Sequence, residues 1–337
     1  MSGNTGSSQL KKRPNEILSN LDLRWSLFMR KYASLTGAKH IVVRLVMYLL
    51  ILGLAFVFLY PFLYMIATSL MSNSDLNSTS VHWFPTEVKF ENFSIALQLM
   101  NIKRYAVNSG VVTVIATFGH VIACSFIGYG FARYNFPLKK VLFACVILAF
   151  IVPTQTLIIP LYITYSNLQW LNSYLPLLVP TFFGFGLKGA LYIFLFRQFF
   201  LTVPKSLEEA ARIDGCGFMM TYWRIVFPLA KATIVVAMVL AVVWHWNDHY
   251  EPGMYVRDPN LTFLPPRLNQ IIAAASALPD QQAEMLRQLG LDDGEDTLNN
   301  AVIMAGALII SAPVLLFFAF AQRQFMQGIE RTGITGE

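Results

Sequence analysis

Charged residues are scarce in this sequence. Aspartate, glutamate, lysine and arginine make up 13% of its 337 residues, whereas soluble globular chains carry about 25%. Hydrophobic residues make up 55%, and the mean hydropathy is +0.53. These values argue against a soluble enzyme and exclude a disordered chain. We therefore expect a membrane protein with several helical spans.

Cysteine and metal-ligand patterns are sparse as well. The three cysteines, Cys124, Cys145 and Cys216, form no C-x-x-C pair and are too few for a disulfide framework. His245 and His249 are four residues apart, but a tryptophan stands where the zinc motif H-E-x-x-H has its glutamate. We therefore expect no metal site.

Motifs for ATP binding and for catalysis are missing. The P-loop pattern G-x-x-x-x-G-K-[ST] does not occur, and the glycine-rich stretch at 184–189 lies inside an apolar segment. H-E-x-x-H, G-x-S-x-G and paired carboxylates in an apolar segment are absent too. We expect no enzymatic activity and no cofactor bound by this chain, so a partner must supply any energy from ATP.

Six charge-poor stretches are present, and a helix of about 20 apolar residues spans a bilayer. The expected spans are residues 45–74, 105–132, two within 141–187, 232–247 (beginning near Pro228) and 297–322. A polar turn at 166–173 joins the third span to the fourth. We therefore predict an all-α, six-helix membrane domain. The expected parts are an extension 1–40, the domain 41–322 with loops 197–231 and 248–296, and a tail 323–337.

Lysine and arginine are distributed unevenly between the segments that link the spans. Six spans place both termini on one side, and the segments of that side hold 17 of the 25 lysine and arginine residues. Positive charge marks the cytoplasmic side. We therefore expect a multi-pass membrane protein with both termini in the cytoplasm, in contact with lipid. Topology thus explains the basic residues, and no nucleic-acid partner is expected.

The cytoplasmic segment 197–231 contains its own helix signals. Ser206 to Glu209 match the capping box S-x-x-E, which predicts a helix that begins there. Gly215 stands where a helix ends in the left-handed conformation. A second helix, from about Phe218 to Arg224, leads to Pro228 and the fifth span. We predict a helix, a glycine turn and a helix, with an apolar surface that faces either the bundle or a partner protein.

A spaced pattern runs through the same segment. Glu209-Ala210-Ala211 is followed by Asp214-Gly215, then by Ile225, and finally by Phe227-Pro228. This pattern resembles the coupling loop of permease subunits of ATP-driven (ABC) importers, with phenylalanine in place of the usual leucine before the proline. The resemblance implies a role in ATPase coupling for Glu209, Ala210, Ala211, Asp214, Gly215, Ile225 and Pro228.

Further segments carry the resemblance along residues 40 to 335. Trp246-Asn247-Asp248, Thr262 to Pro265 and Gln322 to Gly328 are similar to segments of sugar-importer permeases, namely the smaller, six-span subunit of the maltose-type pair. Residues 269–296 depart from that pattern as an insertion, and the end of the chain lacks the family's basic residues.

The resemblance also implies a location in the bacterial cytoplasmic (inner) membrane, together with partners and a mechanism. The partners would be ATP-binding cassette ATPase subunits, a second homologous permease and an extracytoplasmic solute-binding protein. The ATPase subunits would bind the ATP, and their closure would drive alternating access of the membrane pathway to the two sides. The solute would be a sugar, most simply an oligosaccharide.

Polar groups inside apolar segments are candidates for the substrate pathway. Sugars are uncharged and bind through hydrogen bonds and aromatic faces, so amides and tryptophan suit them better than charges. The candidates are Asn108, Gln155, Lys188, Trp246 and Asn247.

Other functions stay open at this point. The same machine could carry another solute, such as a glycerol-phosphate ester or a polyamine. A membrane-embedded enzyme would need a catalytic set that the sequence lacks. A secondary transporter would be expected to show internal repeats and intramembrane acids, and neither is evident.

Overall fold

The computed structural model describes residues 37–78, 83–186, 188–277 and 298–333, and every regular element in these ranges is a helix. The expected extension 1–40 and insertion 269–296 therefore lie largely outside the described residues, as does the end of the tail. The chain divides into two compact units, Met1–Tyr64 and Met65–Glu337. The described part of the first unit belongs to α2 (Gly37–Ser69), which continues into the second.

Helix α2 is apolar on nearly every side from Ile41 to Ser69, which is typical of a helix surrounded by lipid. It contains Pro61, a residue that membrane helices tolerate where the freed backbone groups find other partners. The helix ends at Ser69 and not at residue 74 as expected. The next residues form the short α3 (Asn73–Leu76), because Ser72 and Asp75 build a capping box there.

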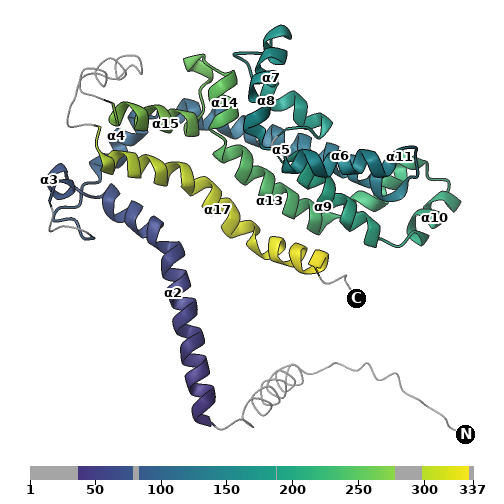
Figure 1. Cartoon of the computed structure of the whole chain (residues 1–337), viewed down its shortest axis with the longest axis horizontal. Coiled ribbons are helices and arrows are strands. Elements are labelled where there is room, and N and C mark those ends of the chain that lie inside the picture. Colours follow the sequence, from purple (N-terminus) through teal and green to yellow (C-terminus); the bar gives the residue numbers. More distant parts are fainter. Residues whose placement is uncertain (1–36, 79–82, 187, 278–297, 334–337) are drawn as a thin grey trace, which may run out of the picture. The chain divides into compact units, whose positions relative to one another are not determined.

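Four helices form the centre of the second unit. Helix α5 (Ile102–Arg133) packs against α9 (Gly189–Thr202) and α13 (Lys231–Asn247), and α13 packs against α17 (Asn300–Gly333) (Figure 1). Large aromatic side chains fill the α5–α9 contact. The fully buried aromatic side chains of this cluster are Tyr129, Tyr192, Phe196, Phe200 and Tyr222.

Small residues let α5 and α9 approach closely. A Cβ atom on Gly128 of α5 would lie 2.8 Å from the Phe196 Cβ and 2.9 Å from the Arg197 backbone nitrogen. Glycine is therefore required at this crossing, as is common where membrane helices pack.

The segment after α5 is broken where prolines occur. Helices α6 (Lys139–Ile151) and α7 (Thr154–Asn167) are bent by 103° at Val152 and Pro153. Proline has no N–H to donate and favours an extended residue before it. The expected third span is thus a bent pair of helices.

The expected fourth span, within residues 174–187, is wrong. That stretch holds the short α8 (Leu175–Leu178) and the 3-10 turn η1 (Val179–Phe183), which ends at a left-handed Gly184. The apolar helix is α9, which begins at Gly189 and continues through Arg197 to Thr202. A hydropathy pattern misses this break, because both sides of it are apolar.

Two further groups of short helices complete the unit. The first group follows α9 along the chain and consists of α10 (Ser206–Ile213), α11 (Phe218–Thr221), the π-turn η2 (Tyr222–Val226) and α12 (Phe227–Leu229). A bend of 78° separates Phe218–Leu229 from α13, which therefore begins at Lys231 and not near Pro228. The remaining elements are α4 (Glu91–Leu99), α14 (Tyr250–Tyr255), η3 (Pro259–Leu261) and α15 (Leu264–Ala275).

Three of the described helices, α2, α5 and α17, are each long and apolar enough to cross a membrane. The bent pairs α6–α7 and α11–α13 raise this number to five if each pair is one span, and α9 is a shorter apolar helix. The all-α membrane fold is thus confirmed, while the count of six spans stays a prediction.

The close crossing of α5 and α9 predicts a contrast between two glycines of one helix. Gly128→Ala should lower the free energy of unfolding by ~1–3 kcal/mol, because its methyl group would meet backbone atoms of α9. Gly130→Ala should leave it unchanged or raise it, because nothing lies within 4 Å of a Cβ there. Thermal unfolding of the two purified variants in detergent measures the difference, and equal midpoints would contradict it.

Candidate functional site

Helix α10 begins one residue earlier than the capping-box motif predicts. Its N-cap is Lys205, and no side chain caps this end by a hydrogen bond. The backbone N–H groups of Glu208 and Glu209 both donate to the Lys205 carbonyl oxygen, at 3.0 Å each. Ser206 is therefore the first helical residue and not the cap, so the predicted capping box does not form.

The end of α10 is a glycine-dependent Schellman turn. Gly215 has φ +81°. The Cys216 N–H donates to the Ala211 carbonyl oxygen at 2.9 Å, and the Gly215 N–H donates to that of Arg212 at 3.0 Å. These two bonds satisfy carbonyls that a helix end leaves open. The left-handed glycine predicted at position 215 is thus confirmed.

Helix α10 has one face toward the bundle and one toward solvent. Glu208 and Ala211 are buried, three residues apart on the inner face. Glu209 and Ala210 are exposed, and the Ile213 side chain is 86% exposed. The spaced pattern of the sequence is therefore divided between two faces, because Ala210 points outward while Ala211 packs inward.

The remaining residues of the pattern lie around this outer face. Asp214, Gly215 and Pro228 are exposed, and Ile225 is half-buried. Large apolar side chains of the following turn are exposed as well, namely Phe218, Met219, Met220 and Trp223. Such a surface is typical of a contact with another protein or with lipid.

The inner face of α10 carries a buried ion pair. Glu208 Oε1 lies 2.6 Å from Nε of Arg133, the last residue of α5. The Tyr129 hydroxyl donates to Glu208 Oε2 at 3.2 Å. Sequence reasoning missed this pair, because it treated Glu208 only as a helix-forming residue. The available signal was an acid three residues before Ala211, on the face that packs inward.

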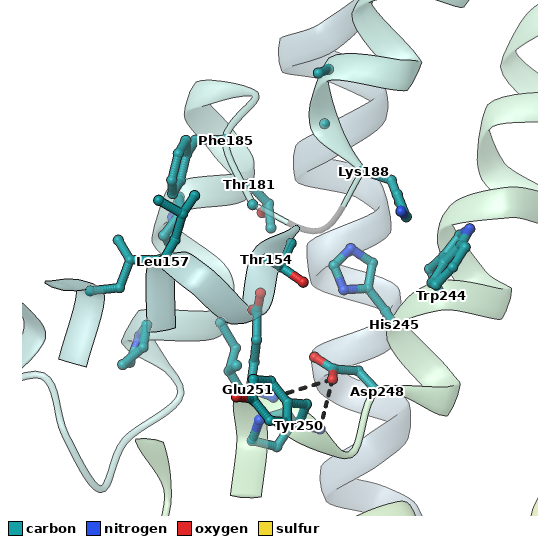
Figure 2. A pocket seen from close by; sticks show the side chains of 18 of the residues that line it. Thr154, Leu157, Thr181, Phe185, Lys188, Trp244, His245, Asp248, Tyr250 and Glu251 are labelled. Atoms are coloured by element: carbon teal, nitrogen blue, oxygen red, sulfur yellow. Dashed lines mark hydrogen bonds between the residues drawn. The ribbon is translucent and has the colours of Figure 1, made fainter. Parts of the chain in front are cut away.

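A second feature is a cavity of about 780 Å³ inside the unit (Figure 2). It is bordered by residues of α5, α6, α7, α13, α14 and the turn between η1 and α9. At one end the Lys188 ammonium lies 4.6 Å from the centre of the Trp244 ring. Asp248 and Glu251 lie at the other end, with His245 between (Figure 2).

Four of the five expected pathway residues border this cavity: Gln155, Lys188, Trp246 and Asn247. The Trp246 indole donates to the Ile310 carbonyl oxygen at 2.9 Å, so it also ties α13 to α17. Asn108 is not among the lining residues. Its amide donates to the carbonyl oxygens of Asn260 and Thr262, so it holds the segment after α14 against α5.

A pair of histidines supports one wall of the cavity. Nδ1 of His120 lies 2.9 Å from Nε2 of His245, and Nε2 of His120 lies 3.3 Å from the Phe185 carbonyl oxygen. A carbonyl only accepts, so His120 Nε2 donates to it, and Nδ1 of a neutral His120 accepts from His245. His245 thus pairs with His120 and not with His249. Within the described residues, no group of three or more histidine, cysteine, aspartate or glutamate side chains could hold a metal ion.

Two acids, Asp248 and Glu251, lie at the other end of the cavity. Asp248 Oδ1 accepts the backbone N–H groups of Tyr250, at 2.9 Å, and Glu251, at 3.3 Å, so it satisfies two N–H groups at the start of α14 (Figure 2). Burial raises the pKa of Asp248. Burial also raises the pKa of Glu251, and the neighbouring Asp248 charge adds to the shift.

Comparisons with known proteins agree on one family. Residues 121–331 match the model of the binding-protein-dependent transport system inner membrane component. The melibiose, raffinose and stachyose import permease MelC of Bacillus subtilis is 27% identical over 82% of this chain and 91% of its own length. The arabinooligosaccharide transport permease AraQ of Halalkalibacterium halodurans is 25% identical over 84% of this chain and 93% of its own.

Two other matches extend this range. The sn-glycerol-3-phosphate transport permease UgpE of Yersinia enterocolitica is 28% identical over 66% of this chain and 70% of its own length. A chain of a solved bacterial ABC transporter that imports the acidic polysaccharide alginate has a TM-score of 0.65 at 21% identity, covering 84% of this chain and 96% of that one. The last match supports the fold.

The Schellman turn predicts unequal effects at two neighbouring glycines. Gly215→Ala should destabilise the end of α10 by ~1–2 kcal/mol, because alanine disfavours the left-handed conformation although its methyl group has space. Gly217→Ala is the control, because Gly217 has φ −72° and an equally open site. Hydrogen exchange of the α10 amides should be faster in the first variant only. Equal exchange in both variants would refute the assignment.

Glu251 predicts a pH-dependent contribution to stability. Its folded-state pKa is raised above 4.5, so the stability that its protonated form contributes is lost as the pH rises through the folded value. Unfolding midpoints of the wild type and of Glu251→Gln should therefore be close at about pH 5, with the variant increasingly the more stable toward about pH 9. A difference between the two that does not change with pH would contradict this.

Proposed function

This chain belongs to the family of binding-protein-dependent transport system inner membrane components, and from this premise we propose that it is a permease subunit of an ATP-driven sugar importer. It forms half of a membrane pathway, and a second homologous permease forms the other half. ATPase subunits bind and hydrolyse ATP, and an extracytoplasmic binding protein delivers the solute. The chain itself binds no ATP and catalyses no reaction.

The outer face of α10 is the observation that carries the coupling role. It presents Glu209 and Ala210 beside Ile213, and the Gly215 turn fixes the direction of the chain that follows. A small residue lets a partner backbone approach, while a carboxylate and an apolar side chain give it charge and surface to contact. The ATPase subunit docks on this face, and its closure moves α10.

Orientation follows from charge. The distribution of lysine and arginine supports a location of segment 197–231 and both termini on the cytoplasmic side of the inner membrane, where ATP is available. The outer segment that begins at Asp248 then faces the side from which a binding protein delivers solute.

The chemistry of the cavity supports a sugar as the solute. Amide groups of Gln155 and Asn247 border it together with the aromatic rings of Phe185 and Trp244. Amides hydrogen-bond hydroxyl groups, and aromatic faces cover the apolar faces of sugar rings. MelC and AraQ, which are named for oligosaccharides, are similar along most of the chain.

One observation favours a second candidate solute, an anionic ester such as a glycerol phosphate. Lys188 brings an ammonium group to the cavity, and UgpE is named for sn-glycerol-3-phosphate. A polyamine is less well matched, because Asp248, one of the two acids at the cavity, is already occupied by backbone N–H groups.

The proposal predicts ATP-driven uptake that depends on the outer face of α10. The chain, expressed with the ATPase, second permease and binding protein encoded beside it, should take up a labelled oligosaccharide in proteoliposomes with ATP inside. Glu209→Ala should lower the uptake rate about tenfold or more, because a charged contact is worth ~1.5–3 kcal/mol. Glu91→Ala, at an exposed acid on α4, should not.

Other outcomes would redirect the proposal. Uptake of glycerol phosphate but not oligosaccharide, abolished by Lys188→Gln, would favour the anionic solute. Failure of any ATPase to co-purify, with uptake driven by a proton gradient alone, would refute the importer and favour a secondary transporter.

A further inference from the structure

The ion pair between α5 and α10 is buried, and burying two charges costs free energy. The side chains of Arg133 and Glu208 are only 5% and 8% exposed, and Nε and Oε1 are 2.6 Å apart. Removing two charges from water costs about as much as their attraction returns, so such a pair is weak evidence of stabilisation. Loss of one partner, in contrast, leaves an uncompensated charge. The pair therefore holds two elements in one relative position.

Four chain segments meet at this pair. Arg133 ends α5, and its guanidinium also donates to the Val203 carbonyl oxygen in the link between α9 and α10. Tyr129, one turn earlier on α5, donates to Glu208. The Tyr129 ring stacks on Phe218 of α11, with ring centres 5.8 Å apart. The end of α5 thus contacts the chain just before α10, at Val203, and just after it, at Phe218.

The other end of α5 reaches the cavity. The helix is continuous over 32 residues, about 48 Å at the usual rise. Ser109 and Val112 border the cavity, and Ser109 lies roughly 36 Å from Arg133 along the axis. Between them His120 contacts His245 of α13. A displacement of α10 that is passed to Arg133 therefore reaches the cavity wall through one unbroken helix.

Adjacent acids of α10 then have opposite tasks. Glu209 lies on the outer face, while Glu208 points inward to Arg133. We propose that Arg133 and Glu208 are positioning residues that make α5 and α10 move as one body, so that ATPase closure is passed to the cavity wall. This rests on the proposed function, because it assigns a transmission path to the same importer.

The test measures coupling separately from assembly. The complete complex in lipid nanodiscs or proteoliposomes is assayed for retained ATPase, for ATP hydrolysis and for solute uptake. Glu208→Gln should retain the ATPase and its hydrolysis, but lower the solute transported per ATP about tenfold. Glu209→Gln is the matched control at the neighbouring position, and it should instead weaken retention of the ATPase. Arg133→Lys, which keeps the charge, should fall between wild type and Glu208→Gln.

A double variant that exchanges the two charges distinguishes a loss of coupling from simple misfolding. The double variant Arg133→Glu with Glu208→Arg should recover at least a third of the wild-type ratio of transport to hydrolysis. If Glu208→Gln does not assemble, this double variant decides: recovery of assembly together with the ratio supports the proposal, and any other result overturns it. An unchanged ratio in Glu208→Gln also overturns it. Absence of ATP-driven uptake in the wild type would instead refute the proposed function.

Discussion

The close crossing of α5 and α9 is the contact on which the rest of this structure depends. Gly128 leaves no side chain between the two helices, and the aromatic residues around them fill the space on either side. This crossing fixes the end of α5 next to the end of α9, so the chain that leaves α9 must turn at Val203 beneath Arg133. The position of α10 follows from that turn. A packing contact between apolar helices thus decides where a charged, solvent-facing helix lies.

The cavity depends on a different constraint, namely that backbone groups in a membrane must be satisfied within the protein. The breaks at Val152–Pro153 and at Gly184–Gly189 free several such groups. His120 donates to one of them, the Phe185 carbonyl oxygen, and the cavity provides space beside others. Broken helices and a cavity therefore occur together, because irregular backbone at membrane depth is tolerated where it is buried or borders such a space.

The features that could be predicted from the sequence are those that depend on composition or on the spacing of nearby residues. Composition predicted the membrane fold, and residue spacing predicted the left-handed Gly215 and the helix before it. Contacts between distant segments could not be predicted. His120 and His245 are 125 residues apart, and no local pattern connects Arg133 with Glu208. The fourth span was misplaced for a related reason, because hydropathy measures how apolar a segment is and does not show where its backbone turns.

The opposite orientation of Glu208 and Glu209 has a consequence for how such a loop can change over generations. A helix turns by about 100° per residue. Insertion of one residue between Val203 and Glu208 would therefore rotate the inward carboxylate away from Arg133 and bring an outward residue into its place. Substitutions on the exposed face would leave this register unchanged. Geometry thus constrains the length of this link, while the partner that docks on the outer face constrains the residues there.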